Sequence, residues 1–130
     1  MQTVDGFELS AKHVSWLGPG EIPTFAARLA FASVNGEPDW REPLLVLTNT
    51  RLVISKNKTF GAHKADCAVL WSEVSAVSNG PWHGAFNPLV QLDVRTARGV
   101  LKLPVVNIYA TEVENAIRTQ DLNAFLRGSR

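Results

Sequence analysis

Apolar and polar side chains alternate along several segments of this chain with a period of two, the spacing typical of β-strands. The clearest example is residues 89–96, where Val90, Leu92 and Val94 fall on one side of the chain and polar residues fall on the other. Such a segment buries one face and exposes the other. A short turn follows, and residues 100–106 predict the returning strand.

Residues 44–56 read LLVLTNTRLVISK and contain two apolar runs separated by a polar break. Apolar runs of this length, bounded by turn-forming residues, predict two strands joined as a hairpin. Thr48 and Thr50 lie in the break, and their hydroxyl groups favour a turn because they can bond to nearby backbone groups. We therefore interpret Thr48 to Arg51 as a turn that shapes the hairpin.

Further segments complete the predicted strands. Residues 24–33 alternate loosely and favour a strand, although their alanines also allow a helix. Residues 67–71 and 74–78 predict two short strands, and Trp71 at the end of the first is expected in the core. Residues 35–39, Asn-Gly-Glu-Pro-Asp, predict a loop. Short strands of this kind, about seven in all, indicate a β sandwich or barrel.

One helix is predicted near the C-terminus. Thr111 and Glu114 have the spacing of a capping box, in which each side chain bonds to the backbone near the other. A mostly apolar stripe follows at helical spacing, formed by Val113, Ala116, Ile117, Gln120 and Ala124. Leu122 and Leu126 lie away from this stripe. Either the helix breaks near residues 120–121, or another surface covers a second apolar face.

Strands followed by one helix predict a mainly β domain, in which the helix closes one open end. A length of 130 residues and a hydrophobic fraction of 45% suit a single domain with a real core. Residues 1–17 are expected to form an N-terminal extension packed on the domain. Residues 18–127 form the domain itself, and residues 128–130 are expected to be a disordered tail.

Two sequence segments carry a resemblance to a known family. Residues 45–54 read LVLTNTRLVI, residues 70–77 read LWSEVSAV, and Pro19-Gly20-Glu21 precedes both. Residues 18–124 resemble the bacterial PH-like and GRAM-like domains of the pleckstrin homology (PH) superfamily. The resemblance implies a PH-like barrel of about seven antiparallel strands capped by one C-terminal helix. It also implies a non-enzymatic scaffold that binds lipid head groups, peptides or partner proteins.

The chain departs from the phosphoinositide-binding members of that superfamily in the loop after the first strand. Those members hold phosphates there with several lysines and arginines. Residues 35–42 instead carry Glu37, Asp39 and Glu42 against Arg41 alone. Three carboxylates repel a polyphosphate. We therefore predict that this loop does not recognise phosphoinositides.

Catalysis, cofactor binding and metal binding find no support in the sequence. The single cysteine, Cys67, can form neither an intrachain disulfide nor a cysteine-rich metal site. His13, His63 and His83 lack the spacing of metal ligands, and no nucleophile turn or phosphate-binding loop appears. We predict a protein without enzymatic activity, cofactor or metal.

Charge and hydropathy limit the classes of partner and the cellular location that the sequence allows. A net charge of +1 argues against nucleic-acid binding, which needs a clustered basic surface. No segment approaches the roughly 18 apolar residues that span a bilayer. The N-terminal residues lack the basic and apolar regions of a secretory signal. These features predict a cytoplasmic protein, with peripheral contact at the membrane as a further option.

Large apolar residues outside the predicted core are the candidate contacts for a protein partner or for a second copy of the chain. They are Trp40, Trp82, His83, Phe86, Leu122 and Leu126. The aromatic loop at residues 82–88 either presents a partner-binding knob or folds over the end of the barrel as core. Contact with protein, including self-association, is our leading functional hypothesis.

A basic cluster supports a second hypothesis, which is weak binding to anionic membrane lipid. The candidate residues are Arg51, Lys56, Lys58, His63 and Lys64. Each basic residue near an anionic surface contributes only about 1 kcal/mol. The alternative is an ordinary solvated loop. A small apolar ligand inside the barrel is a third option, which would need a cavity.

Overall fold

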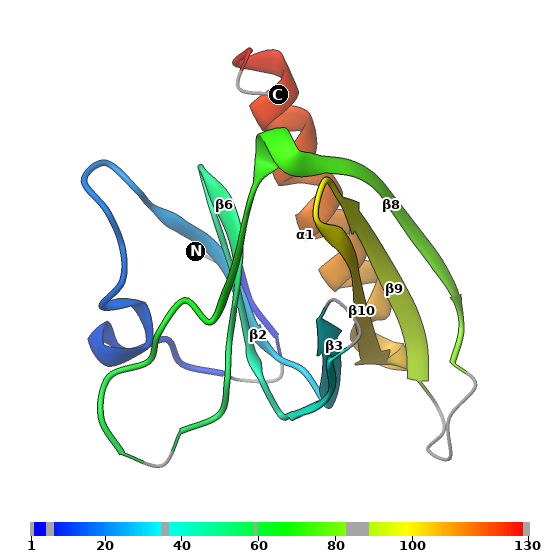
Figure 1. Cartoon of the computed structure of the whole chain (residues 1–130), viewed down its shortest axis with the longest axis horizontal. Coiled ribbons are helices and arrows are strands. Elements are labelled where there is room, and N and C mark those ends of the chain that lie inside the picture. The colour runs from blue at the N-terminus through cyan, green and yellow to red at the C-terminus, as the bar shows by residue number, and fades with distance from the viewer. Residues whose placement is uncertain (1, 5–6, 35–36, 59, 83–88, 129–130) are drawn as a thin grey trace.

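The structure is a computed structural model, and it describes residues 2–4, 7–34, 37–58, 60–82 and 89–128. These residues form two five-stranded sheets and one long helix (Figure 1). Short 3₁₀ helices, η1 (Ala11–Val14) and η2 (Trp71–Glu73), lie between strands.

The first sheet has the strand order β1-β2-β5-β6-β7. Its strands are β1 (Gln2–Thr3), β2 (Pro23–Arg28), β5 (Leu44–Thr48), β6 (Arg51–Ser55) and β7 (Cys67–Leu70). β1 runs parallel to β2, and the other pairs are antiparallel. The predicted hairpin is confirmed as β5 and β6.

The second sheet has the order β4-β3-β10-β9-β8 and is antiparallel throughout. Its strands are β3 (Phe31–Val34), β4 (Glu37–Arg41), β8 (Val74–Pro81), β9 (Leu89–Thr96) and β10 (Gly99–Val106). The helix α1 (Asn107–Leu126) follows β10 directly. The predicted class, antiparallel strands followed by one C-terminal helix, is confirmed, and no strand pairing between described residues closes the sheets into a barrel.

The structure corrects the predictions for residues 24–41. The segment at 24–33 forms two strands rather than one, because the chain crosses from the first sheet to the second near Leu29 and Ala30. At this crossing the Leu29 N–H bonds to the Pro43 carbonyl, and the Glu42 N–H bonds to the Ala30 carbonyl. Part of the predicted loop at 35–39 belongs to β4, which pairs with β3. The neighbouring strand outweighs the low strand propensity of its Glu, Pro and Asp.

Two predicted ends are also corrected. β8 continues past residue 78 to Pro81, because residues 79–81 pair with β9. The helix begins at Asn107, so Thr111 is an exposed residue inside it and the predicted capping box is wrong. β10 runs straight into the helix, which leaves Val106 at the N-cap position. The helix also continues without a break through residues 120–121.

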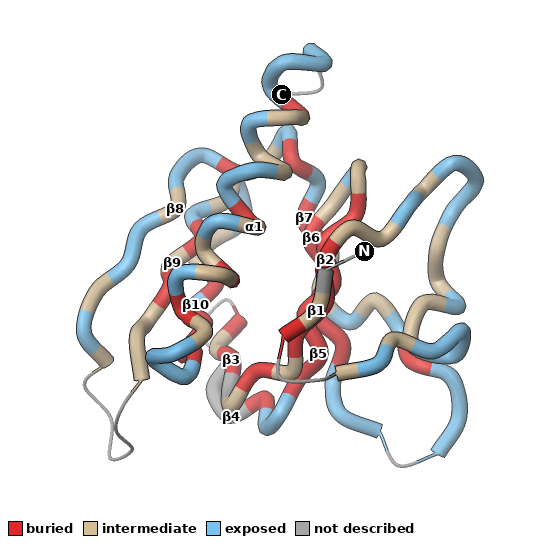
Figure 2. Tube along the Cα trace, turned by 180° about the vertical axis from the view of Figure 1, so that it is seen from behind, coloured by how far each residue is buried: buried red, intermediate tan, exposed pale blue. Residues whose placement is uncertain are grey.

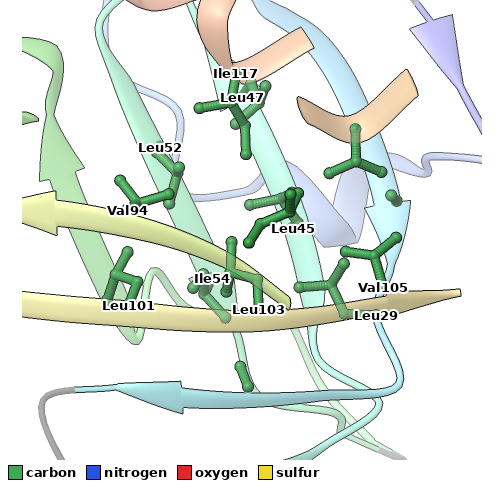
Figure 3. Close-up of a cluster of buried hydrophobic side chains, with 14 of the residues drawn as sticks. Leu29, Leu45, Leu47, Leu52, Ile54, Val94, Leu101, Leu103, Val105 and Ile117 are labelled. Atoms are coloured by element: carbon green, nitrogen blue, oxygen red, sulfur yellow. The ribbon is translucent and has the colours of Figure 1, made fainter. Parts of the chain in front are cut away.

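The core lies between the two sheets and the inner face of α1. In Figure 3, Leu45, Leu47 and Ile54 from the first sheet face residues of β10 and the helix. The helical contribution is Ala110, Val113, Ile117 and Ala124, which confirms most of the predicted stripe. Figure 2 shows buried residues concentrated on the strands and exposed residues along the outer side of α1.

The outer face of the first sheet is covered as well. Ala26, Leu44 and Val46 form a second apolar cluster on this face. The N-terminal segment packs over it with Phe7, Leu9, Val14 and Trp16. Every residue of β5 is therefore buried, which explains why its sequence is a continuous apolar run and not an alternating one.

Candidate functional site

The turn between β5 and β6 is held by one carboxylate. The Glu21 side chain accepts hydrogen bonds from the hydroxyls of Thr48 and Thr50, each at 2.8 Å, and from Arg51 Nε at 2.7 Å. Thr48 Oγ1 also accepts from the N–H groups of Thr50 and Arg51, which confirms its role in shaping the turn. The residues of this turn therefore serve the fold.

Glu21 is a buried anion, with a side chain only 5% exposed. Burial opposes its ionisation, but hydrogen bonds from Arg51, the Gly18 N–H and the two threonines outweigh burial and lower the pKa of Glu21 to about 2. Arg51 is neutralised by this ion pair and lies over the Trp16 ring at 4.9 Å. Its charge is therefore already matched within the chain.

The predicted basic residues do not converge on one place. Arg51 is at the hairpin turn, and Lys56 Nζ lies 4.7 Å from the centre of the Trp40 ring. Lys58 Nζ donates to the Ala62 carbonyl at 3.1 Å, and Lys64 is exposed. Of the predicted set, only Lys58 lies close enough to His63 to affect its charge.

His63 is buried, at 4% exposure, and neither of its ring nitrogens has a hydrogen-bond partner among the described residues. Its ring packs edge-on against the ring of His13, with 4.7 Å between the centroids. Burial, followed by the charges of Arg28, Lys12 and Lys58, lowers the pKa of His63. Sequence inspection missed this cluster, because its members come from separate elements and share no motif.

The predicted aromatic contacts have different outcomes. Trp40 is only 7% exposed and belongs to the core, so little of its ring is open to a partner. Trp82 is half-buried, and its Nε1 atom is enclosed with no hydrogen-bond partner from the residues that the structure describes. His83 and Phe86 lie outside the described residues, so the prediction for this loop stays a prediction.

Large apolar side chains gather at the C-terminal end of α1. Leu122, Phe125 and Leu126 are 56%, 57% and 72% exposed, and we call them the helix-end cluster. Residues three and four positions apart are neighbours on a helix surface, so the three side chains form one patch. The last turns of α1 project beyond the sheets (Figure 1). Helical periodicity indicated Leu122 and Leu126 but missed Phe125.

A shallow groove lies beside the helix end. It has a volume of about 290 Å³, and Asn49, Leu70 and Arg127 are among its lining residues. Arg127 Nη2 donates to the Asn49 carbonyl at 2.6 Å and so connects the end of α1 to the hairpin turn. Leu70 adds another half-exposed apolar side chain to this region.

The outer edge of β7 is covered by an ion pair. Arg98 Nε lies 3.0 Å from a Glu73 carboxylate oxygen, and Arg98 Nη2 donates to the Ala68 carbonyl at 2.6 Å. Glu73 also accepts a bond from the Leu70 N–H. Backbone groups that an added strand would need are thus already bonded. A groove of about 340 Å³, lined in part by Trp40 and Arg98, lies next to this edge.

The described residues include no group of three side chains that could hold a metal ion. Burial raises the pKa of the Cys67 thiol, which keeps it in the unreactive protonated form. Within the same part of the chain, no helix combines the length and the apolar character required to cross a bilayer.

Comparison with solved structures finds two pleckstrin homology domains. The "Vps36 N-terminal PH domain" is 13% identical and has a TM-score of 0.63, over 85% of this chain and 86% of that one. A pleckstrin homology domain from Shewanella amazonensis SB2B is 15% identical and has a TM-score of 0.51, over 82% of this chain and 77% of that one. No protein-family model matches the chain, and no curated protein matches it.

The chain therefore has a PH-like fold, as its sequence resemblance predicted. At these identities the likeness concerns the fold alone. The narrower GRAM-like resemblance stays a prediction.

Proposed function

We propose that the protein is a non-enzymatic interaction module that associates with a second copy of itself through the helix-end cluster. The observation that carries this proposal is the exposure of Leu122, Phe125 and Leu126 as one apolar patch at the projecting end of α1. Clustered apolar side chains of this size are characteristic of protein contact sites. The PH-like fold supports a binding role, because the fold serves as a scaffold for recognition surfaces.

A second copy suits this surface for two reasons. The patch itself carries no charge that would select an oppositely charged partner. A two-fold axis beside the helix end would also bury the patches of both copies at once, with the groove next to Leu70 giving room for the partner's side chains. Each large apolar side chain contributes up to about 1.5–3 kcal/mol when fully buried. Association costs about 4–15 kcal/mol, so we expect a weak, concentration-dependent dimer.

Replacing both Leu122 and Phe125 with serine is expected to abolish self-association. The native chain should rise from its monomer mass of 14.2 kDa towards twice that value as its concentration increases. The double variant should stay at the monomer mass, because the apolar area that drives association is lost. Size-exclusion chromatography with light scattering, from about 10 µM to 1 mM, measures this directly.

Ile108→Ser is the matched control. Ile108 is 75% exposed on the same helix. It lies eighteen residues before Leu126, or about 27 Å along the axis. This variant should associate as the native chain does. A native chain that stays monomeric at every concentration, or an equal loss in the Ile108 variant, would rule out this surface.

The alternative, peripheral binding to anionic lipid through the basic loop, has less support. Arg51 is paired with Glu21, and His63 is buried, so two of the five candidate residues are withdrawn from the surface. Vesicle sedimentation with anionic lipid at low salt distinguishes the two proposals, and we expect no binding. We keep the cytoplasm as the proposed location.

A further inference from the structure

The N-terminal segment is attached to the loop that follows β6 through two histidines. The rings of His13 and His63 are in contact, with 4.7 Å between centroids and planes 67° apart. The backbone N–H of His63 donates to the Lys12 carbonyl at 3.1 Å, and Ser15 Oγ donates to the backbone carbonyl of His63 at 3.3 Å. We call His13 and His63 the histidine pair. It joins residues 7–17 to residues 56–66.

The bond from the Ser10 backbone favours a neutral His13. The Ser10 backbone N–H donates to His13 Nδ1 at 2.9 Å, and this bond closes the first turn of η1. Nδ1 can accept the bond only while it carries a lone pair and no proton. The Ser10 hydroxyl also lies 2.9 Å from Nδ1. A doubly protonated His13 ring would lose the bond from the Ser10 N–H and bring two N–H groups together, and only the hydroxyl could then accept from Nδ1.

His63 is equally unsuited to carrying a charge. Its ring is buried, and within the part of the chain that the structure describes neither nitrogen has a hydrogen-bond partner. A buried cation without a partner is strongly disfavoured. Burial of the neutral ring already removes the two hydrogen bonds that water would supply. The buried position of His63 therefore costs free energy even when the ring is uncharged.

The surrounding positive charges also favour the neutral form of both histidines. Burial is the largest cause that lowers the pKa of His63. The charges of Arg28 in β2, Lys12 in η1 and Lys58 in the loop lower it further, and the charge of Asp66 raises it. Burial, then the neighbouring His63, Arg28 and Lys12 lower the pKa of His13.

We propose that the histidine pair is an acid-sensitive switch: protonation of His13 and His63 releases residues 7–15 and uncovers part of the outer face of the first sheet. The face that becomes accessible is formed by Ala26, Leu44 and Val46. Trp16 stays in place, because Arg51 lies over its ring and donates to its carbonyl at 3.1 Å. Trp16 Nε1 also donates to the His13 carbonyl at 2.8 Å, and this bond is lost on release. β1 remains paired with β2, so the segment opens as a loop between β1 and Trp16.

The direction of the pH dependence follows from proton binding. The ordinary histidine pKa is 6.5, and both rings are lowered from it in the closed state. Above this pH neither state is protonated and the segment is closed. As pH falls below 6.5, the open state binds protons that the closed state does not. Opening then increases by up to about tenfold per pH unit for each histidine, until the lowered pKa is reached.

The uncovered face is a flat apolar surface on β2 and β5, next to the strand β6. Phe7, Leu9, Val14 and Trp16 cover it in the closed state, and the first three leave it on opening. Its exposure would give the molecule a second apolar contact surface, separate from the helix-end cluster and present only in acid.

Hydrogen exchange of the native chain tests the switch. Exchange is measured by mass spectrometry at pH 7.5 and pH 5.5 and corrected for the intrinsic rate of each amide. We expect protection within residues 10–15 and 60–66 to fall at least about tenfold at the lower pH. Amides of β10 should keep their protection, which excludes global unfolding. Equal protection of the segment at both pH values would overturn the proposal.

A double variant, His13→Asn with His63→Leu, removes the titration while keeping the closed contact. Asparagine can accept the Ser10 N–H, and leucine needs no hydrogen-bond partner. This variant should stay closed at pH 5.5, whereas the control His83→Gln should open like the native chain. An unchanged pH response in the double variant would refute the assignment.

Nuclear magnetic resonance titration of the imidazole C–H signals is independent of any variant. Both His13 and His63 in the native chain should titrate below 6.5. A pKa at or above that value for both rings would overturn the switch.

Discussion

Replacing Trp71 with alanine is expected to lower the free energy of unfolding by about 4 kcal/mol, in the range measured for large aromatic side chains removed from cores. Trp71 is 1% exposed where β7 passes into η2. Its Nε1 atom donates to the Thr48 carbonyl at 2.9 Å and so connects the core to the hairpin turn. The substitution leaves a cavity and removes this donor. Urea denaturation followed by circular dichroism measures the loss without depending on tryptophan fluorescence.

Two controls separate the packing of Trp71 from its hydrogen bond. Trp71→Phe keeps one aromatic ring but loses the donor and the volume of the second ring, so an intermediate cost of about 1–3 kcal/mol is expected. Leu70→Ala changes the adjacent residue, which is 50% exposed, and should cost below about 1 kcal/mol. A Trp71→Ala variant no less stable than Leu70→Ala would show that Trp71 does not support the core.

The fold was predictable where the information is local. The runs that became β5 and β6 are apolar because both faces of β5 are covered, and an unbroken apolar run is visible without any knowledge of its partners. The alternation in β9 gives buried Leu92 and Val94, as expected for a strand with one face on the core. Helical spacing likewise identified Val113 and Ile117.

The errors fall where a distant partner determines the structure. Residues 37–41 have loop-forming chemistry, yet they form β4 because β3 offers a strand to pair with. Asn107 begins the helix because β10 delivers the chain to that point, which overrides the better capping sequence at Thr111. Neither contact leaves a signature in the local sequence.

In the candidate site, too, local features were predictable and contacts between distant segments were not. Arg51 resembled a free cation, because the sequence does not show that a carboxylate 30 residues away binds it. His63 lies in a loop, as its sequence indicated, but it is buried against His13, which is 50 residues away in the sequence. Leu122 and Leu126 were found because helical periodicity alone separates them from the core stripe. Local pattern therefore reveals surfaces on one element and misses clusters assembled from several.

Glu21→Gln is expected to lower the free energy of unfolding at pH 7 by about 3 kcal/mol, as for the loss of one partner from a buried ion pair. Glutamine keeps the size of the side chain but removes the charge that Arg51, Thr48 and Thr50 bind. Arg51 is then left partly buried, with its side chain 22% exposed and no carboxylate beside it. Urea denaturation at pH 7 measures the loss.

The pH dependence of stability provides the sharper test of Glu21. Its pKa is lowered from 4.5 to about 2 in the folded chain, so the unfolded chain binds the proton first as pH falls. The contribution is fully present above pH 4.5 and is lost between pH 4.5 and about 2, and this shift corresponds to about 3 kcal/mol. Glu21→Gln should remove this part of the acid sensitivity. Glu8→Gln, which changes an exposed carboxylate, should keep it. If native and Glu21→Gln chains lose stability equally between pH 4.5 and 2, Glu21 does not hold the hairpin turn through its charge.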